Sequence, residues 1–200
     1  AHAGRFAGLG PPTGSGRLAQ EDDMNSAPET YDAIVIGGGP AGATAAHELA
    51  RQGRRVLLLD RAGRIKPCGG AIPPRLIRDF GIPDELLVAR ATSARMIAPS
   101  DHRVDIPIEN GFVGLVDRDQ FDEWLRERAR KAGAERRSGV FERIERDADG
   151  TAVVVFRPRD GHAGEELPPA RVRAKRVVGA DGARSEVARQ TVPGAEKTKY

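Results

Sequence analysis

The sequence has few of the features that define several common protein classes. Its 200 residues include one cysteine, Cys68, so no disulfide can form within the chain, which fits a reducing compartment. Aromatic residues make up 4% of the chain, too few for a platform on which nucleic-acid bases stack. The longest apolar runs, at 33–36, 56–59 and 152–156, are far shorter than the roughly 18 residues of a membrane-spanning helix. We therefore expect no transmembrane segment.

The sequence also lacks a large excess of charge of one sign. The chain has 32 lysines and arginines against 29 aspartates and glutamates, which gives a net charge of +3. Because basic and acidic residues alternate and form no long block, we do not expect a nucleic-acid partner. An apolar fraction of 39% is enough to bury a core. The histidines have no metal-ligand spacing, so no metal site is expected. They are His2, His47, His102 and His162.

Composition divides the chain into three segments. Residues 1–30 are rich in glycine, proline, alanine and serine without any periodicity, which predicts a disordered extension. Residues 31–191 carry the folded domain, and the chain is long enough for one domain of ordinary size. Residues 192–200 are interpreted as the start of a longer remainder. Because the first residue is not methionine and the last residues form no closing element, we expect a fragment truncated at its C-terminus.

The first folded residues predict an α/β unit. Two short apolar runs, 31–36 and 56–60, have the length and composition of buried strands. Between them, 40–52 predicts a helix rich in small residues, which ends at Gly53. Two strands joined by one helix indicate the start of a parallel sheet.

Later segments predict antiparallel strands and a second long helix. Apolar residues at helical spacing predict a helix over 118–132, with Asp117 as N-cap and an ion pair of Asp122 with Arg126. A separate short buried strand is expected at 176–180. Antiparallel strands are expected at 93–116, 139–146, 151–157 and 169–174.

A glycine motif follows the first strand and opens the first helix. Gly37 permits a tight turn, Gly39 lets the backbone approach a pyrophosphate, and Gly42 lets the helix pack close to the strand. The unpaired N–H groups at the start of the helix, around Ala41, would bind phosphates. Asp60 ends the second strand, where an acid can bind a ribose hydroxyl. The context predicts a dinucleotide site; the alternatives are a structural glycine turn and a surface carboxylate.

The glycine motif alone does not distinguish FAD from NAD, but the later chain does. After Asp60 the sequence leaves the sheet and returns with Asp181-Gly182 behind the predicted strand at 176–180. This pairing resembles the two fingerprints of flavoprotein hydroxylases and their relatives. The resemblance implies a Rossmann-like FAD-binding domain of the flavoprotein hydroxylase type with inserted antiparallel strands, in which the Asp-Gly motif helps hold the flavin. A simple turn is the alternative for Asp181-Gly182.

A third motif narrows the family. The segment 66–76, Lys-Pro-Cys-Gly-Gly-Ala-Ile-Pro-Pro-Arg-Leu, resembles the loop of geranylgeranyl reductases of (bacterio)chlorophyll synthesis, as do 61–63, 104–111 and 116–122. The resemblance implies an FAD protein that uses NADPH. It would hydrogenate three double bonds of a geranylgeranyl chain, as the free diphosphate or as the bacteriochlorophyll ester, and so form phytyl.

The same resemblance assigns further cofactor-binding residues and no catalytic residue. Gly69-Gly70 would let backbone lie against the isoalloxazine ring, and Cys68 would contact the flavin or deliver a proton, unless it is a small buried thiol. Arg118 would reach the phosphate or ribityl region, unless it is a solvated helix-end arginine, and Val140 would contact adenine through its backbone. The candidates are Gly37, Gly39, Ala41, Gly42, Asp60, Arg61, Cys68, Gly69, Gly70, Arg118, Val140, Asp181 and Gly182.

Partners and alternatives follow from these motifs. With one glycine motif in the chain, NADPH has no Rossmann site of its own and is expected to dock transiently in the flavin cleft. We expect a cytoplasmic protein, and contact with the photosynthetic membrane is inferred only from the insolubility of the substrate. An aromatic hydroxylase, an archaeal lipid prenyl reductase and a non-catalytic prenyl-binding escort are alternatives. Asp60 and Asp181-Gly182 count against the escort, and we expect the fragment alone to be inactive.

Overall fold

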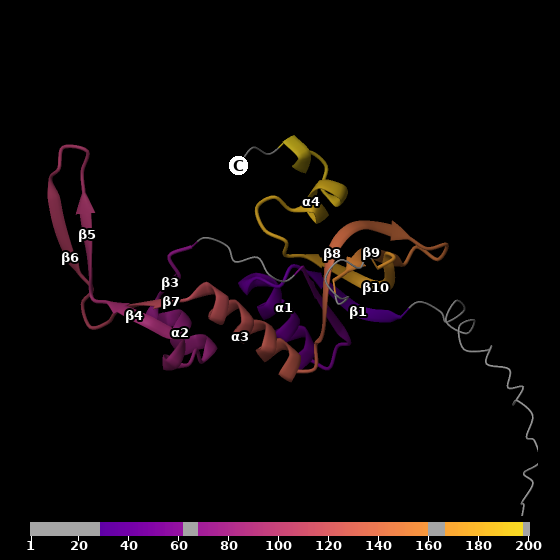
Figure 1. The fold of residues 1–200 in the computed structure, drawn as a ribbon, viewed down its shortest axis with the longest axis horizontal. Coiled ribbons are helices and arrows are strands. Elements are labelled where there is room, and N and C mark those ends of the chain that lie inside the picture. The colour runs from indigo at the N-terminus through magenta and orange to yellow at the C-terminus, as the bar shows by residue number, and fades with distance from the viewer. Residues whose placement is uncertain (1–28, 62–67, 160–166, 198–200) are drawn as a thin grey trace, which may run out of the picture.

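Five strands close into a barrel, which lies toward the right in Figure 1. In order around the barrel they are β1 (Thr30–Ile36), β10 (Ala170–Gly179), β9 (Ala152–Pro158), β8 (Glu135–Arg146) and β2 (Val56–Asp60). β1 is parallel to β2 and β10, and β2 is parallel to the start of β8. β9 is antiparallel to both β8 and β10. The computed structural model describes residues 29–61, 68–159 and 167–197.

The two faces of the parallel strands pack against different layers. Successive strand residues point to opposite faces, so Val35 and Leu58 lie in a cluster with helical residues. Ile34 and Leu57 lie in a second cluster with residues of β9 and β10. Because both faces are covered, β1 and β2 read as continuous apolar runs rather than alternating ones.

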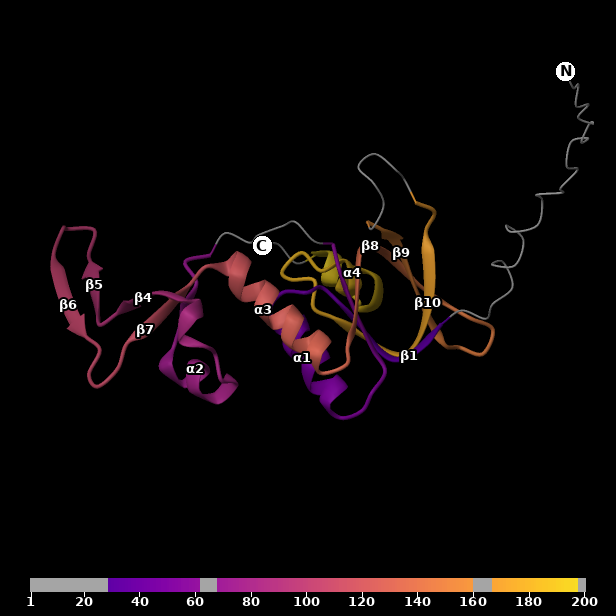
Figure 2. The same ribbon diagram turned by 60° about the horizontal axis from the view of Figure 1, so that its bottom comes forward.

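Two helices cover one face of the parallel strands, α1 (Pro40–Arg51) and α3 (Arg118–Lys131), and they lie side by side (Figures 1 and 2). Small side chains on α1 let the two helices approach closely. Both helices end within one residue of the predicted positions, and Asp117 is the N-cap of α3, accepting the backbone N–H of Asp119 at 3.0 Å. The buried residues are Ala43, Ala46 and Ala50 of α1 and Phe121, Leu125 and Ala129 of α3.

The segment between β2 and α3 forms a smaller layer. Two antiparallel strands at its far end, all of whose residues are exposed, project away from the rest of the protein (Figure 2). The predicted strands in 93–116 are thus confirmed. The elements are β3 (Ala71–Ile72), α2 (Pro74–Phe80), η1 (Asp84–Leu86), β4 (Leu87–Ala91), β5 (Ser93–Ile97), β6 (Arg103–Pro107) and β7 (Val113–Val116). β3, β7 and β4 form one sheet.

The expected separate strand at 176–180 is instead the end of β10. This strand pairs with β9 over Ala170–Ala174 and with β1 over Arg173–Gly179, so a change of partner does not interrupt it. Its end is also less buried than predicted, since Val177 and Val178 are half-buried. β8 begins at Glu135, before the expected residue 139, because its first residues pair with β2.

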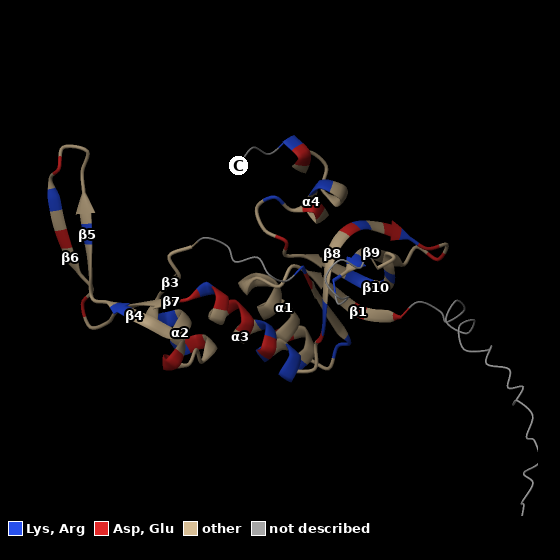
Figure 3. Ribbon diagram, viewed as in Figure 1, with Lys and Arg blue, Asp and Glu red and all other residues tan. Residues whose placement is uncertain are grey.

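The chain ends with two short helices, α4 (Glu186–Thr191) and η2 (Ala195–Lys197). Of the predicted extension at 1–30, residues 1–28 lie outside the described residues, and Thr30 already belongs to β1. Charges of both signs alternate along α3 and β8, whereas the charged residues of β10 are all basic (Figure 3). No helix in the described ranges has the length and apolar composition needed to cross a membrane.

Candidate functional site

The carboxyl ends of the parallel strands meet at one edge of the barrel. The glycine motif follows β1, Asp60 ends β2, and Asp181-Gly182 follows β10. A cleft of about 710 Å³ lies at this edge, which we call the strand-end cleft. Ligands of parallel α/β sheets bind at this position. Predicted residues that line it are Gly37, Gly39, Asp60, Arg61, Val140 and Asp181.

Two glycines of the motif are required by the packing of the protein itself. Gly37 has φ +104°, and a Cβ there would lie 2.5 Å from the carbonyl oxygen of Ala180. The glycine motif and the Asp-Gly motif therefore touch, although they are far apart in sequence. A Cβ on Gly42 would lie 1.8 Å from the carbonyl oxygen of Gly37. These contacts agree with the predicted tight turn and close helix approach.

Gly39 differs, because the space in front of it is open. An added Cβ would meet no heavy atom of the described residues within 4 Å, and φ −72° is accessible to any residue. Gly39 is the N-cap of α1, and the first helical bond runs from the Ala43 N–H to its carbonyl. Pro40 has no N–H, so the amides of Ala41 and Gly42 are helix-end donors without intrahelical acceptors. This cradle fits an anion such as a pyrophosphate.

Asp60 lies against the middle of the glycine motif. A Cβ on Gly38 would lie 2.8 Å from Cβ and Cγ of Asp60, so only glycine fits beside this carboxylate. Nη1 of Arg126, from α3, lies 3.4 Å from Oδ2 of Asp60 and donates to the carbonyl oxygen of Gly38 at 3.2 Å. The carboxylate is thus held at the cleft, next to the helix start whose amides fit an anion.

The Asp181 carboxylate has a structural role. It accepts hydrogen bonds from the Ser185 hydroxyl at 2.5 Å, from the Glu186 N–H at 2.7 Å and from the Val187 N–H at 3.2 Å. The side chain therefore caps the start of α4. Gly182 beside it is exposed with φ +89°. What this motif presents to Gly37 is the backbone of residues 180 and 181.

The remaining predicted residues gather at the start of α3. Gly70 has φ +65°, and a Cβ there would lie 2.0 Å from the carbonyl oxygen of Val116, whose N–H donates to the Gly70 carbonyl at 3.0 Å. Gly70 is therefore required by pairing within the protein. Gly69 is exposed, and an added Cβ would meet no described atom within 4 Å. Only Gly69 offers the open backbone expected of both glycines, and 66–67 lie outside the described residues.

A buried ion pair connects this group to the strand-end cleft. The Arg118 guanidinium donates to both carboxylate oxygens of Asp122 at 2.9 Å, and Asp122 lines the cleft. The side chains of Arg118 and Asp122 are 14% and 12% exposed, so Arg118 is not the solvated arginine of the alternative interpretation. Cys68 is exposed, which excludes the buried thiol. The pKa of the Cys68 thiol is lowered, mainly by a hydrogen bond from the Gly70 N–H and to a smaller extent by one from Arg118.

The lowered pKa makes a prediction about the reactivity of Cys68. At neutral pH a larger fraction of this thiol is thiolate than in an ordinary cysteine, and the thiolate is the nucleophile. Arg118→Gln removes the second of the two hydrogen bonds, so the pKa should rise and alkylation by iodoacetamide at neutral pH should slow several-fold. The pH profile of the alkylation rate measures this directly, because the chain has no other cysteine. A midpoint that Arg118→Gln leaves in place contradicts the prediction.

Sequence reasoning missed Arg126 and Gly38. The predicted ion pair of Asp122 with Arg126 is wrong, because Asp122 binds Arg118 and Arg126 reaches Asp60 instead. The helical period allows Asp122 either neighbour four residues away, so spacing alone could not decide. The available signal was that Arg118 and Arg126, eight residues apart, share one face of α3.

These features define the class of the protein as an α/β domain that binds a dinucleotide at the carboxyl ends of its parallel strands. The sequence profile of the FAD binding domain family matches residues 30–199, and the chain belongs to that family. The expected fold class is thereby confirmed. The open Gly39 cradle and the Asp60 carboxylate fit the phosphates and a ribose of FAD.

Proteins similar to this chain carry the names that the loop at 66–76 led us to expect. The chain is 65% identical to geranylgeranyl diphosphate reductase of Rhodobacter capsulatus over 166 residues, which is 83% of this chain and 41% of that protein. The chloroplastic geranylgeranyl diphosphate reductase of Arabidopsis thaliana is 38% identical over 80% of this chain and 36% of that protein. A geranylgeranyl bacteriochlorophyll reductase-like structure from Thermoplasma acidophilum superposes with a TM-score of 0.72 at 27% identity. The superposition covers 84% of this chain and 43% of that protein. The chain spans about two fifths of the length of these curated relatives.

Proposed function

We propose that this chain is the cofactor-binding part of an NADPH-dependent flavoprotein reductase. The enzyme hydrogenates three double bonds of a geranylgeranyl chain, as the diphosphate or as the bacteriochlorophyll ester, to give phytyl. The observation that carries the proposal is the 65% identity to the Rhodobacter capsulatus reductase over most of this chain. The range so matched is long enough to include both nucleotide motifs and the Pro-Cys-Gly-Gly loop.

The residues of this chain bind and orient the cofactor. FAD, when bound, supplies the hydride chemistry that reduction of an isolated double bond requires and that side chains lack. The helix-end amides of Ala41 and Gly42 hold its diphosphate. The Asp60 carboxylate accepts a hydrogen bond from a hydroxyl of the adenosine ribose. Arg118, the first residue of α3, is fixed by Asp122 and presents its guanidinium beside Cys68. The open backbone at Gly69 leaves room for a planar ring at that end.

NADPH and the prenyl substrate complete the proposal. With one glycine motif in the chain, NADPH docks transiently at the flavin rather than in a second Rossmann site. Each double bond takes up one hydride, which originates from NADPH, and one proton. The protein is proposed to be cytoplasmic and to meet its insoluble substrate at the surface of the photosynthetic membrane.

The test is reduction by the full-length gene product under anaerobic conditions. The protein is incubated with NADPH and either geranylgeranyl bacteriochlorophyll or geranylgeranyl diphosphate, and the prenyl chain is followed by mass spectrometry. We expect stepwise gain of up to three hydrogen pairs on one of the two substrates. Bound FAD that NADPH reduces, together with unchanged mass of both substrates, would contradict the proposal. Oxygen consumption coupled to an aromatic substrate would instead support a hydroxylase.

A further inference from the structure

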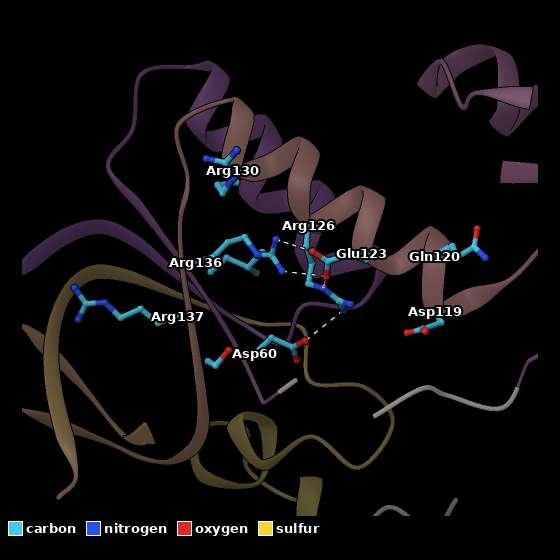
Figure 4. A pocket seen from close by; sticks show the side chains of 10 residues that line it. Asp60, Asp119, Gln120, Glu123, Arg126, Arg130, Arg136 and Arg137 are labelled. Atoms are coloured by element: carbon cyan, nitrogen blue, oxygen red, sulfur yellow. Dashed lines mark hydrogen bonds and ion pairs between the residues drawn. The ribbon is translucent and has the colours of Figure 1, made fainter. Parts of the chain in front are cut away.

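A chain of polar contacts runs from β8 of the barrel to the glycine motif. Arg136 of β8 donates to both carboxylate oxygens of Glu123 at 2.9 and 3.1 Å. Glu123 in turn accepts from Nε of Arg126 at 2.9 Å, and Nη1 of Arg126 reaches Asp60 (Figure 4). The same Nη1 donates to the Gly38 carbonyl. Burial raises the pKa of Glu123, but the bonds from Arg136 and Arg126 outweigh it and keep this pKa below its ordinary value.

Arg126 stands between two groups that otherwise repel each other. The Asp60 carboxylate packs directly on Gly38, where a Cβ would be only 2.9 Å from Oδ2. The Gly38 carbonyl and the carboxylate both present negative oxygen atoms, and Nη1 of Arg126 lies within 3.4 Å of an oxygen of each. A shared cation of this kind holds a carboxylate in one orientation. Without it, Asp60 is free to rotate away from the position that a ribose hydroxyl requires.

The position of Arg126 separates it from the surface arginines of α3. Its side chain is 18% exposed, whereas Arg130, one turn further along the same helix, is 57% exposed and binds Glu127. A second cavity, of about 750 Å³, lies between α3 and β8 (Figure 4). Among the described residues, Asp60 and Arg126 alone line both this cavity and the strand-end cleft. The pair thus forms the wall of the cleft at its ribose end.

We propose that Arg126 is a positioning residue that makes the site select flavins carrying an adenosine. By fixing the Asp60 carboxylate against Gly38, it prepares the ribose contact that FAD makes and that FMN, which lacks adenosine, cannot make. Arg118 serves the opposite end of the cofactor, since eight residues of helix place it about 12 Å further along the axis of α3. Arg126 therefore affects the adenosine end only. The inference rests on the proposed function solely in taking FAD as the cofactor.

The experiment measures the dissociation constants of FAD and FMN for the full-length apoprotein by flavin fluorescence. Arg126→Gln should weaken FAD binding about tenfold, as for the loss of one hydrogen bond to a charged group. Binding of FMN should change less than about twofold. The wild-type preference for FAD over FMN therefore falls about tenfold, and Arg126→Lys, which keeps the charge, recovers part of it. Arg130→Gln is the matched control and should leave both constants unchanged.

The outcomes separate this inference from its alternatives. A merely structural role of Arg126 would weaken FAD and FMN equally, and that result overturns the proposal, as does an unchanged preference. If Arg126→Gln does not fold, Glu123→Gln decides, because it releases Arg126 from its anchor and should lower the preference for FAD in the same direction. The measurement requires no turnover, so a protein that prefers FAD through Arg126 but reduces no prenyl chain supports the inference while the proposed function fails.

Discussion

Gly39→Ala is expected to lower the affinity for FAD about 100-fold while the free energy of unfolding stays within about 1 kcal/mol of the wild type. The added Cβ meets no described atom within 4 Å, and φ −72° suits alanine, so the folded protein tolerates it. Replacing glycine at a compatible position stabilises a protein by about 0.4–1 kcal/mol through the unfolded chain. Alanine is less favourable than glycine at a helix N-cap, so this gain is offset. The same methyl group occupies the space in which the pyrophosphate approaches the helix-end amides. Losing two charge-assisted hydrogen bonds there corresponds to about 100-fold.

The measurement pairs FAD titration with urea unfolding monitored by circular dichroism. Gly111→Ala is the matched control, because its added Cβ would find its nearest neighbours only at 3.8–3.9 Å and it lies outside the lining of the strand-end cleft. This control should change neither FAD affinity nor stability by more than a small amount. Wild-type affinity for FAD in the Gly39→Ala protein would show that the pyrophosphate does not approach the backbone at this residue.

The elements around the glycine motif could be predicted from the sequence because their signals are local. β1, α1 and β2 lie within one residue of the expected positions, since the apolar runs, the small-residue helix and Gly53 specify them without distant partners. The position of Asp60 beside the glycine motif also followed, because parallel strands place their carboxyl ends at one edge. The cleft was therefore predictable in place, whereas the predicted residues make up only part of its lining.

The details that failed depend on partners far away in the sequence. Arg126 reaches Asp60 across 66 positions, and no helical period indicates which residue a side chain on a given face will meet. The close approach of Gly70 to the Val116 carbonyl, which itself requires glycine there, could not be predicted either, because the strand of Val116 lies far from the loop in sequence. β10 was expected as two strands because its apolar pattern weakens where its partner changes from β9 to β1.

The Asp-Gly motif can form a structural turn and also contribute to the cofactor site. A turn was the alternative to a flavin contact for Asp181-Gly182, and the structure contains the turn, with Gly182 at φ +89° and the carboxylate capping α4. The same turn places the backbone of residues 180 and 181 against Gly37 at the edge of the cleft. The structural and the cofactor-binding roles are therefore compatible, because they use the side chain and the backbone respectively.

Gly42→Ala is the second large expected effect, and it should destabilise the protein by about 3 kcal/mol. Helix propensity alone predicts the opposite sign, because alanine is favoured over glycine by about 1 kcal/mol inside a helix. The added Cβ, however, would lie 1.8 Å from the carbonyl oxygen of Gly37 and 3.1 Å from Cβ of Ala180. Both neighbours are held in place, since the Gly37 N–H donates to Leu59 and the turn contacts Ala180. Relieving the overlap must move backbone, at a cost that exceeds the propensity gain.

Thermal unfolding of the two alanine variants separates the roles of the glycines in the motif. For a domain of this size a loss of about 3 kcal/mol lowers Tm by roughly 6–12 °C. Gly39→Ala, three residues earlier, should change Tm by less than about 4 °C. FAD affinity should fall in both proteins, in Gly42→Ala because the loop is displaced and in Gly39→Ala because the cradle is filled. A Gly42→Ala protein as stable as the wild type would show that the turn relaxes freely, and the close packing of α1 on β1 would then not be what requires glycine.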